Sequence, residues 1–469
     1  MTDELWRMGA ADLAAAIAGK ELTSSDVVDA HLARIEAVNP ALNAVTVVFA
    51  DEARAAAAEA DRALQRGDAV GPLHGVPMSV KESIDVAGSA TTQGIVALAN
   101  TVPEVDAPHI AQLRAAGAIP IARTNMPDFG LRVHTDNALH GATKNPWDPG
   151  RTPGGSSGGE AVALATGMTP LGMGGDYAGS LRWPAQCCGT VALRPTLGRV
   201  SRASAPPTPE PPSTFQLFAV VGPMARHVRD LRLALGSMSG PDARDPWWTP
   251  APLRNGQAVP VRVAVTADPA GEGVHPDVAA GVRRAAEALA DAGYTVEEVE
   301  PPQVAEARDL FQQLVITEVN AAYLPLLEQL ASPDALRFVQ LGVEAVPPLD
   351  LREYIAGFGT RFAIARAWGQ FQEDWPLVLG PVSALQPFVL GYDLAGVSEA
   401  HAVLNALRLT TLANLLGLPS VALPVGEAGG LPQGVQIIGP RYREDLCLDA
   451  AEAIEERLGV ITPIDPRTG

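Results

Sequence analysis

Cysteine is scarce in this sequence of 469 residues, and its placement excludes two kinds of stabilising site. The three cysteines are Cys187, Cys188 and Cys447, an odd number with two adjacent, which does not make a disulfide framework. No Cys-x-x-Cys pair occurs, and His134 and His140 lie six positions apart without companion ligands, so we predict no metal site. We expect Cys187 and Cys188 to be small buried hydrophobes, and the two histidines to be satisfied loop or core residues.

Basic residues and long apolar runs are also lacking. The chain has 34 Lys and Arg against 53 Asp and Glu, a formal net charge of −19, and its basic residues are not clustered. Because phosphate binding needs clustered cations, we expect no nucleic-acid or membrane partner. The N-terminus carries Asp3 and Glu4 before a short apolar stretch, unlike a signal peptide, and no uncharged apolar run is long enough to span a membrane. We therefore expect a soluble cytoplasmic protein, as a monomer or a homodimer.

Glycine and proline are plentiful, at 45 and 41 residues, and 47% of the chain is hydrophobic. That composition supports a large core with many loops. Segment 204–213 contains five prolines and is predicted to be a loop, which either overhangs a site or is a passive surface loop.

Apolar periodicity predicts helices and strands in an α/β order. The first 70 residues are mostly helical, with caps at Thr23–Asp26, a strand at Val45–Phe49 and a helix at Ala50–Arg66. Short apolar runs alternate with Gly/Pro loops from Gly71 to about Met238. A β–α–β unit follows, and the remaining elements are helices and two late strands: Val261–Val265, Pro276–Gly293, Thr295–Val299, Val304–Leu330, Leu351–Asp374, Ala400–Leu416, Ser420–Pro424, Gly434–Ile438 and Asp445–Leu458.

Small residues are dense between Arg151 and Thr196. One run reads Gly154-Gly155-Ser156-Ser157-Gly158-Gly159, and a second ends in Ala178-Gly179-Ser180. Such runs serve where the backbone takes unusual conformations or where its N–H groups face an anion or oxyanion. One Gly/Ser run alone is more often a structural turn. Two runs, together with a lysine that closes a β-like apolar run at Lys81, favour a catalytic site over structural loops.

Together these blocks resemble the amidase signature family. The matching segments come in the family's order, Ser156 and Ser180 are 24 positions apart, and the resemblance runs from about Leu22 to the C-terminal helix. The segments are Gly75–Asp85, Asn145–Trp147, Thr152–Gly159, Asp176–Ala185, Cys188–Gly189 and Arg194–Ser201.

The resemblance implies a role for each matching residue. Ser180 corresponds to the acyl-forming nucleophile, Ser156 to the bridging serine that follows a cis peptide bond, and Lys81 to the base. Backbone N–H groups correspond to the oxyanion hole, and three further side chains to a supporting network. The oxyanion residues are Tyr177, Ala178, Gly179 and Ser180, the network is Ser157, Asp176 and Arg182, and the acyl pocket, by a weaker match, includes Phe129 and Leu131.

This chemistry places a demand on Lys81. A serine hydroxyl is a weak nucleophile that needs an adjacent base, and lysine is a base only when neutral. Lowering its pKa from ~10.4 to ~7 costs about 4–5 kcal/mol, which the folded core must supply. Two departures from the family, Tyr177 and Ala178, change the wall of the oxyanion hole and suggest an unusual substrate preference.

Two other enzyme classes are weighed against this assignment. Gly154–Gly158 also matches the nucleophile elbow of α/β-hydrolases, but a loop precedes it and the last histidine, His401, falls on a predicted helix. The closer rival is the glutaminase subunit of a tRNA-dependent amidotransferase. That subunit has a Tyr-Asp-Gly block as well as the signature, and this chain lacks the block. A binding protein without activity is disfavoured because Lys81, Ser156 and Ser180 are all present.

The resemblance predicts a three-layer α/β/α sandwich around a large mixed sheet. We expect one domain over 1–469: N-terminal helices in 1–70, the catalytic core in 71–240, and the rest of the sandwich with the pocket walls in 241–469. The expected reaction is hydrolysis of a small amide, hydrazide or carbamate, without a metal or cofactor.

Overall fold

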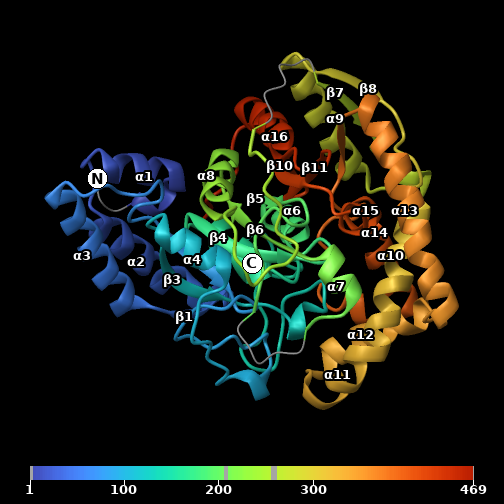
Figure 1. The fold of residues 1–469 in the computed structure, drawn as a ribbon, viewed down its shortest axis with the longest axis horizontal. Coiled ribbons are helices and arrows are strands. Elements are labelled where there is room, and N and C mark those ends of the chain that lie inside the picture. Colours follow the sequence, from blue (N-terminus) through green and yellow to red (C-terminus); the bar gives the residue numbers. More distant parts are fainter. Residues whose placement is uncertain (1–3, 205–209, 255–260, 468–469) are drawn as a thin grey trace.

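A mixed sheet of eleven strands forms the centre of the computed structural model, which describes residues 4–204, 210–254 and 261–467 (Figure 1). The strands are β1 (Val45–Val48), β2 (Pro77–Lys81), β3 (Ile119–Thr124), β4 (Leu171–Asp176), β5 (Val191–Arg194), β6 (Val220–Ala225), β7 (Arg262–Val265), β8 (Thr295–Glu298), β9 (Leu377–Pro381), β10 (Ser420–Ala428) and β11 (Leu431–Ile438). Their order is β1-β3-β2-β4-β6-β5-β10-β11-β9-β7-β8. The pairs β2–β3, β2–β4, β7–β8 and β7–β9 are parallel and the others antiparallel.

The helices precede, connect and follow these strands. They are α1 (Ala10–Ala18), α2 (Ser24–Leu42), α3 (Ala50–Arg66), α4 (Pro108–Ala115), α5 (Gly158–Ala165), α6 (Arg182–Cys188), α7 (Ser213–Phe218), α8 (Val228–Met238), α9 (Pro276–Asp291), α10 (Val304–Glu318), α11 (Leu324–Leu330), α12 (Pro333–Ala345), α13 (Leu351–Asp374), α14 (Val397–Ala406), α15 (Arg408–Leu416) and α16 (Glu444–Leu458). A π-helical segment, Val319–Tyr323, joins α10 to α11.

Both faces of the sheet are buried, as the alternation along its strands shows. In β7, Val263 and Val265 belong to a core that includes residues of α1, α4, α8, α9 and α16. Ala264, between them, belongs to a second core formed with α10, α13 and α15, and residues of α5 and α6 cover the same side further along the sheet. Because successive strand residues point to opposite faces, this pattern gives helix, sheet and helix layers. The predicted α/β/α fold class is confirmed.

Most predicted elements occur where the sequence placed them. Helices α3 and α13 have the predicted bounds, and the Thr23 side chain caps α2 by accepting the Asp26 N–H at 3.0 Å. The β–α–β unit is β7, α9 and β8. Helix α12 and strand β9 were not predicted. Within the predicted loop 204–213, residues 205–209 lie outside the described residues, and Ser213 begins α7.

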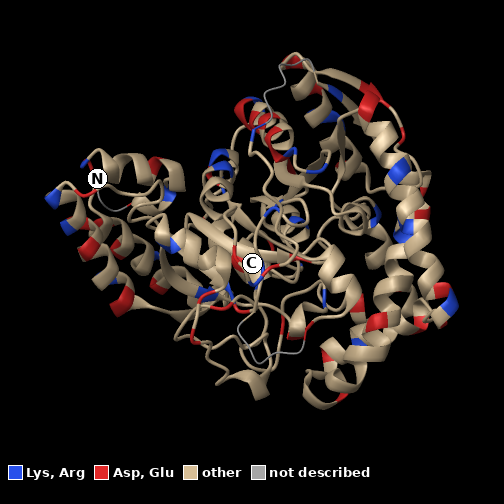
Figure 2. Ribbon diagram, in the orientation of Figure 1, with Lys and Arg blue, Asp and Glu red and all other residues tan. Residues whose placement is uncertain are grey.

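Lys, Arg, Asp and Glu are found mostly on the peripheral helices, whereas the strands at the centre carry few of them (Figure 2). Acidic and basic residues are intermixed at both ends of the molecule, on α3 and on α13. The few charges at the centre are therefore exceptional. Among the helices described, none has both the length and the hydropathy needed to cross a bilayer.

Candidate active site

The ends of two parallel strands place the site. Strand β2 ends at Lys81 and pairs in parallel with β4, which ends at Asp176, so both carboxyl ends lie at the same edge of the sheet. In open α/β sheets the segments that leave this edge form the ligand site. Here they are the segment that leaves β3, which is parallel to β2, and leads through Ser156 into α5, and the turn that leaves β4 and leads through Ser180 into α6.

Lys81 is buried and directed at two serines. Its Nζ donates hydrogen bonds to Ser156 Oγ at 2.6 Å and to Ser157 Oγ at 3.0 Å, and the residue is 2% exposed. Burial lowers the pKa of Lys81 to about 7, although the carboxylates of Asp176 and Glu160 act in the opposite direction. A substantial fraction of Lys81 is therefore uncharged near neutral pH, as a lysine base requires.

The loop that carries Ser156 is shaped by glycines with no room for a side chain. The Gly155–Ser156 peptide bond is cis, as the family resemblance implies. A Cβ on Gly154, whose φ is +82°, would lie 2.6 Å from the Cα of Pro184, and one on Gly155 would lie 2.7 Å from the carbonyl oxygen of Arg132. Real Cβ atoms do not approach backbone this closely, so this loop needs glycine at both positions.

Asp176 organises the turn that carries Ser180. Its carboxylate accepts the Gly179 N–H at 2.9 Å and the Leu181 N–H at 3.3 Å, and Gly179 has a φ of +96°. The carbonyl of Ser180 accepts the Ser157 N–H at 3.3 Å, which ties the two serine loops together. The Ser180 side chain is half-buried, and its hydroxyl makes no hydrogen bond to any described residue.

Of the four residues expected to form the oxyanion hole, Gly179 has its N–H bound to Asp176. The N–H groups of Tyr177, Ala178 and Ser180 donate no hydrogen bond within the part of the chain described. These three remain available to a ligand.

Asp176 sits in a buried charge cluster. Arg182 donates to it at 3.0 and 3.1 Å, Arg194 lies 3.5 Å away, and Asn414 Nδ2 donates at 2.8 Å. Burial alone raises the pKa of Asp176, but the two arginines outweigh it and hold that pKa well below its usual range. Asp176 therefore stays ionised and keeps the turn fixed, because a buried charge needs such partners.

Two apolar clusters include residues of the serine site. Tyr177, beside the Ser180 turn, packs against Phe215 and Phe311 with ring centroids 5.2 and 6.3 Å apart. Phe129 and Leu131 are half-buried and pack in a second cluster with the π-helical segment Val319–Tyr323, and Val315 of α10 packs against both clusters. Gly130, between Phe129 and Leu131, is so close to the site that a Cβ on it would lie 3.1 Å from Ser156 Oγ.

The structure adds residues that motif comparison missed. Glu160, buried in the first turn of α5, has its carboxylate bound by Ser79 and by Thr124 Oγ1 at 2.7 Å. Glu318 accepts from Thr214 and Tyr354, and Thr214 also contacts the Tyr177 hydroxyl at 2.6 Å. Only Glu160 had a sequence signal, a lone charge opening the apolar stretch Ala161–Ala165.

The cysteines and histidines for which the sequence predicts no catalytic or metal-binding role have the expected environments. Cys187 and Cys188 are buried free thiols, and burial raises the pKa of both. His134 is buried against Thr152 Oγ1 at 2.9 Å, and His140 Nε2 lies 3.1 Å from a carboxylate oxygen of Glu82.

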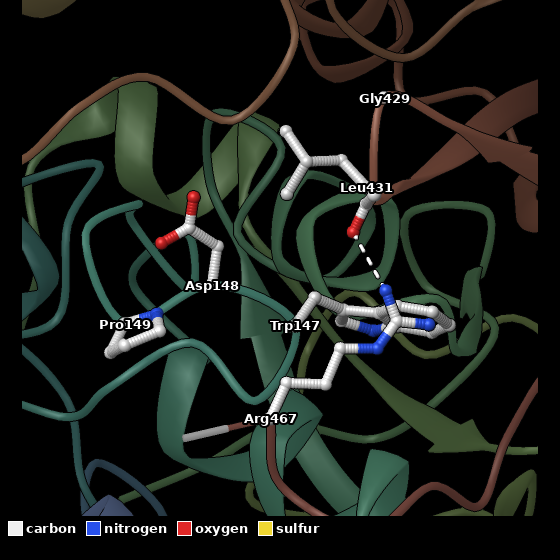
Figure 3. Close-up of a pocket in the computed structure, with 7 residues that line it drawn as sticks. Trp147, Asp148, Pro149, Gly429, Leu431 and Arg467 are labelled. Atoms are coloured by element: carbon white, nitrogen blue, oxygen red, sulfur yellow. Dashed lines mark hydrogen bonds between the residues drawn. The ribbon is translucent and has the colours of Figure 1, made fainter. Parts of the chain in front are cut away.

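A surface pocket of about 250 Å³ lies outside this site (Figure 3). The Arg467 guanidinium stacks over Trp147, 4.4 Å from the ring centroid, and donates to the carbonyl of Gly430 at 3.1 Å. Its lining includes none of Lys81, Ser156, Ser157, Asp176 and Ser180, so we assign it no part in the chemistry.

Comparison with known proteins agrees with the geometry. The model of the Amidase family matches residues 26–448. An indoleacetamide hydrolase of Bradyrhizobium diazoefficiens is 41% identical over 97% of this chain and 88% of that protein. The A subunit of the glutamyl-tRNA(Gln) amidotransferase of Roseiflexus castenholzii is 34% identical over 96% of each chain. A crystal structure of a bacterial aryl acylamidase superposes with a TM-score of 0.84 at 28% identity, covering 97% of this chain and 96% of that one. The chain therefore belongs to the amidase signature family and is a hydrolase of carbon–nitrogen bonds in non-peptide amides.

Proposed function

We propose that the enzyme hydrolyses a small amide with an aromatic acyl group, through an acyl-enzyme on Ser180. The observation that carries the chemistry is the 2.6 Å hydrogen bond between the buried amine of Lys81 and Ser156 Oγ. The observation that carries the substrate class is the pair of apolar clusters that include Tyr177, next to the Ser180 turn, and Phe129 with Leu131.

In the first half-reaction, Ser180 Oγ attacks the amide carbonyl and gives its proton to Ser156 Oγ. Ser156 passes its own proton to the neutral Nζ of Lys81. The proton then returns through Ser156 to the leaving nitrogen, the C–N bond breaks, and ammonia or an amine departs. Because catalytic hydrogen bonds are often long before substrate binds, the free Ser180 hydroxyl is compatible with this relay.

In the second half-reaction, water attacks the ester on Ser180 by the same relay, and the carboxylic acid leaves. The developing oxyanion accepts hydrogen bonds from the N–H groups of Tyr177, Ala178 and Ser180. Such preorganised donors are worth about 10²–10³-fold in rate when one is removed. The support for this assignment is that these groups are unpaired and lie on the turn fixed by Asp176.

The two apolar clusters favour a flat acyl group over a polar one. Tyr177, Phe215 and Phe311 form an aromatic cluster, and Phe129 and Leu131 belong to the second apolar cluster. Arg132, the cation next to Leu131, is 3% exposed and bound to the buried Asp393 at 2.7 Å. Two of its nitrogens, Nε and Nη2, are therefore engaged by Asp393, which counts against this arginine as a holder of the charged end of glutamine. The relative named indoleacetamide hydrolase supports an arylacetamide as the first substrate to test.

The test is a hydrolysis panel of indole-3-acetamide, phenylacetamide, an anilide, an aryl hydrazide, an aryl carbamate, acetamide and glutamine. We expect the arylacetamides to have the highest kcat/KM. Ser180→Ala and Lys81→Ala should each lower it by at least about 10³-fold, as loss of a nucleophile or its base does. Activity that survives Ser180→Ala refutes the mechanism. Turnover of glutamine alone would instead favour the amidotransferase subunit.

A further inference from the structure

Glu160 is a buried carboxylate for which the reaction described so far has no use. It lies in the first turn of α5 and is fully buried. Ser79 Oγ and Thr124 Oγ1 donate to its two oxygens, and Ser79 Oγ also lies 2.8 Å from Thr169 Oγ1. The sheet makes space for it at Gly172, where a Cβ would lie 1.9 Å from Glu160 Oε1.

The same arrangement places this carboxylate beneath the catalytic lysine. Ser79 and Lys81 share one face of β2, because Met78 and Val80 belong to the core on the opposite face. Ser157, which accepts a hydrogen bond from Lys81 Nζ, occupies the position before the first residue of α5, about one turn before Glu160. Lys81 Nζ and the Glu160 carboxylate do not form an ion pair. The amine therefore remains hydrogen-bonded to Ser156 and Ser157, while the charge of the carboxylate still acts on it.

Few other charges act on this pair. The charge of Asp176 on β4 also acts on Lys81, and that of Arg123 on β3 acts on Glu160, although the Arg123 guanidinium itself donates to the carbonyls of Lys81 and Ile84. Glu82, the next residue in the chain, is bound on the other side of the strand by Thr46, Thr92 and His140. Burial raises the pKa of Glu160, against the hydrogen bonds from Ser79 and Thr124 and the charge of Lys81, so the protonation of Glu160 and that of Lys81 depend on each other.

We propose that Glu160 is a positioning residue that sets the protonation equilibrium of Lys81: its carboxylate favours the ammonium form and so fixes the pH above which the enzyme becomes active. This inference rests on the proposed role of Lys81 as the base. Glu160 touches no reacting atom and acts only through the charge that it holds near the amine.

The test is the pH dependence of kcat/KM for Glu160→Gln, measured with the best amide of the panel. The Gln side chain can accept from Thr124 and donate to Ser79, which can then donate to Thr169, so the hydrogen bonds are retained. Removing the negative charge favours neutral Lys81, and the acidic limb should move down by roughly one pH unit, a tenfold change in the proton affinity of the amine. A residue with only a structural role would lower activity at every pH and leave the midpoint of the limb in place.

Two further variants make the result decisive. Glu82→Gln removes a buried charge adjacent in sequence but directed elsewhere, and its acidic limb should stay at the wild-type position. Thr124→Val removes one donor from Glu160, disfavours the carboxylate, and should shift the limb in the same direction by a smaller amount. If Glu160→Gln does not fold, Thr124→Val carries the test.

Failure of the inference is distinct from failure of the proposed function. Activity in Lys81→Ala, or a wild-type profile with no acidic limb, overturns Lys81 as the base. An acidic limb that is present in the wild type and unmoved in Glu160→Gln and Thr124→Val overturns the role of Glu160 alone.

Discussion

Replacing Lys81 with methionine should abolish activity and make the protein more stable. In the unfolded chain the amine has its ordinary pKa of 10.5, whereas in the fold burial lowers it to about 7. A difference of that size, at about 1.36 kcal/mol per pH unit, means that keeping this lysine costs the fold about 4–5 kcal/mol at pH 7. Methionine is unbranched and apolar and fits a similar space without that cost.

Part of the gain is offset. The variant loses the hydrogen bonds from Nζ to Ser156 and Ser157, worth about 1 kcal/mol each. We therefore expect Lys81→Met to raise the free energy of unfolding at pH 7 by about 2 kcal/mol. Such a gain is typical when a group retained for function is removed from a core.

The pH dependence identifies the cause. The pKa of Lys81 is lower in the fold than in the unfolded chain, so between about pH 7 and 10.5 only the unfolded chain binds the proton. The cost of keeping Lys81 in the core therefore grows as the pH falls from 10.5 toward 7, and it shrinks again as the pH rises. The advantage of the methionine variant should therefore be complete at pH 7 and below, and should shrink as pH rises to 9.

The assay is urea unfolding at pH 6, 7 and 9, with Lys144→Met as the control. Lys144 is exposed, so its replacement should change stability by no more than about 0.5 kcal/mol. A Lys81→Met protein less stable than the wild type at pH 7, or a difference that does not shrink by pH 9, would refute the reasoning.

Three further outcomes can be checked by the same methods. Gly179→Ala should lower kcat/KM more than tenfold and cost about 1–3 kcal/mol, because φ is +96° and the new Cβ would lie 2.5 Å from Thr410 Cγ2. The control Gly175→Ala, with its nearest contact at 3.5 Å, should stay within about 1 kcal/mol of the wild type. Asp176→Asn should destabilise the protein by about 3–5 kcal/mol in urea, since it leaves two buried arginines without their carboxylate. The melting temperature should fall as pH drops from 6.5 to about 4, because burial lowers the pKa of three histidines that the unfolded chain protonates: His31, His109 and His134. A melting temperature that does not change over this range would contradict this prediction.

The sequence predicts local features well where a single segment carries the signal. Helix α3 has a strong apolar period and ends at Gly67, in the left-handed conformation that favours glycine. Strand β9 was missed because its three consecutive apolar residues, Leu377 to Leu379, begin only three positions after the end of α13 and lie between Pro376 and Gly380-Pro381, so no alternation marks it. Its place in the sheet is set by β7 and β11, which the local sequence does not specify.

The same limit applies to the site. Lys81, Ser156 and Ser180 are recognisable because each stands in a motif. The contact of Glu160 with Ser79 and Thr124 depends on how β2, β3 and α5 pack, and residues 36 and 81 positions apart in the chain make it. The link from Tyr177 through Thr214 to Glu318 likewise joins three elements that no single motif spans.

The groups assigned to bond cleavage come from residues 81–182. Phe215 and Phe311, the aromatic rings that pack against Tyr177, come from α7 and α10. Tyr177 meets Phe215 and Phe311 only through ring contacts and the Thr214 hydroxyl. Mutations in those two helices can therefore reshape what the enzyme accepts while the hydrolytic apparatus is inherited intact. Substrate specificity can thus change through substitutions in one helix at a time, and laboratory evolution toward new amides should begin at α7 and α10.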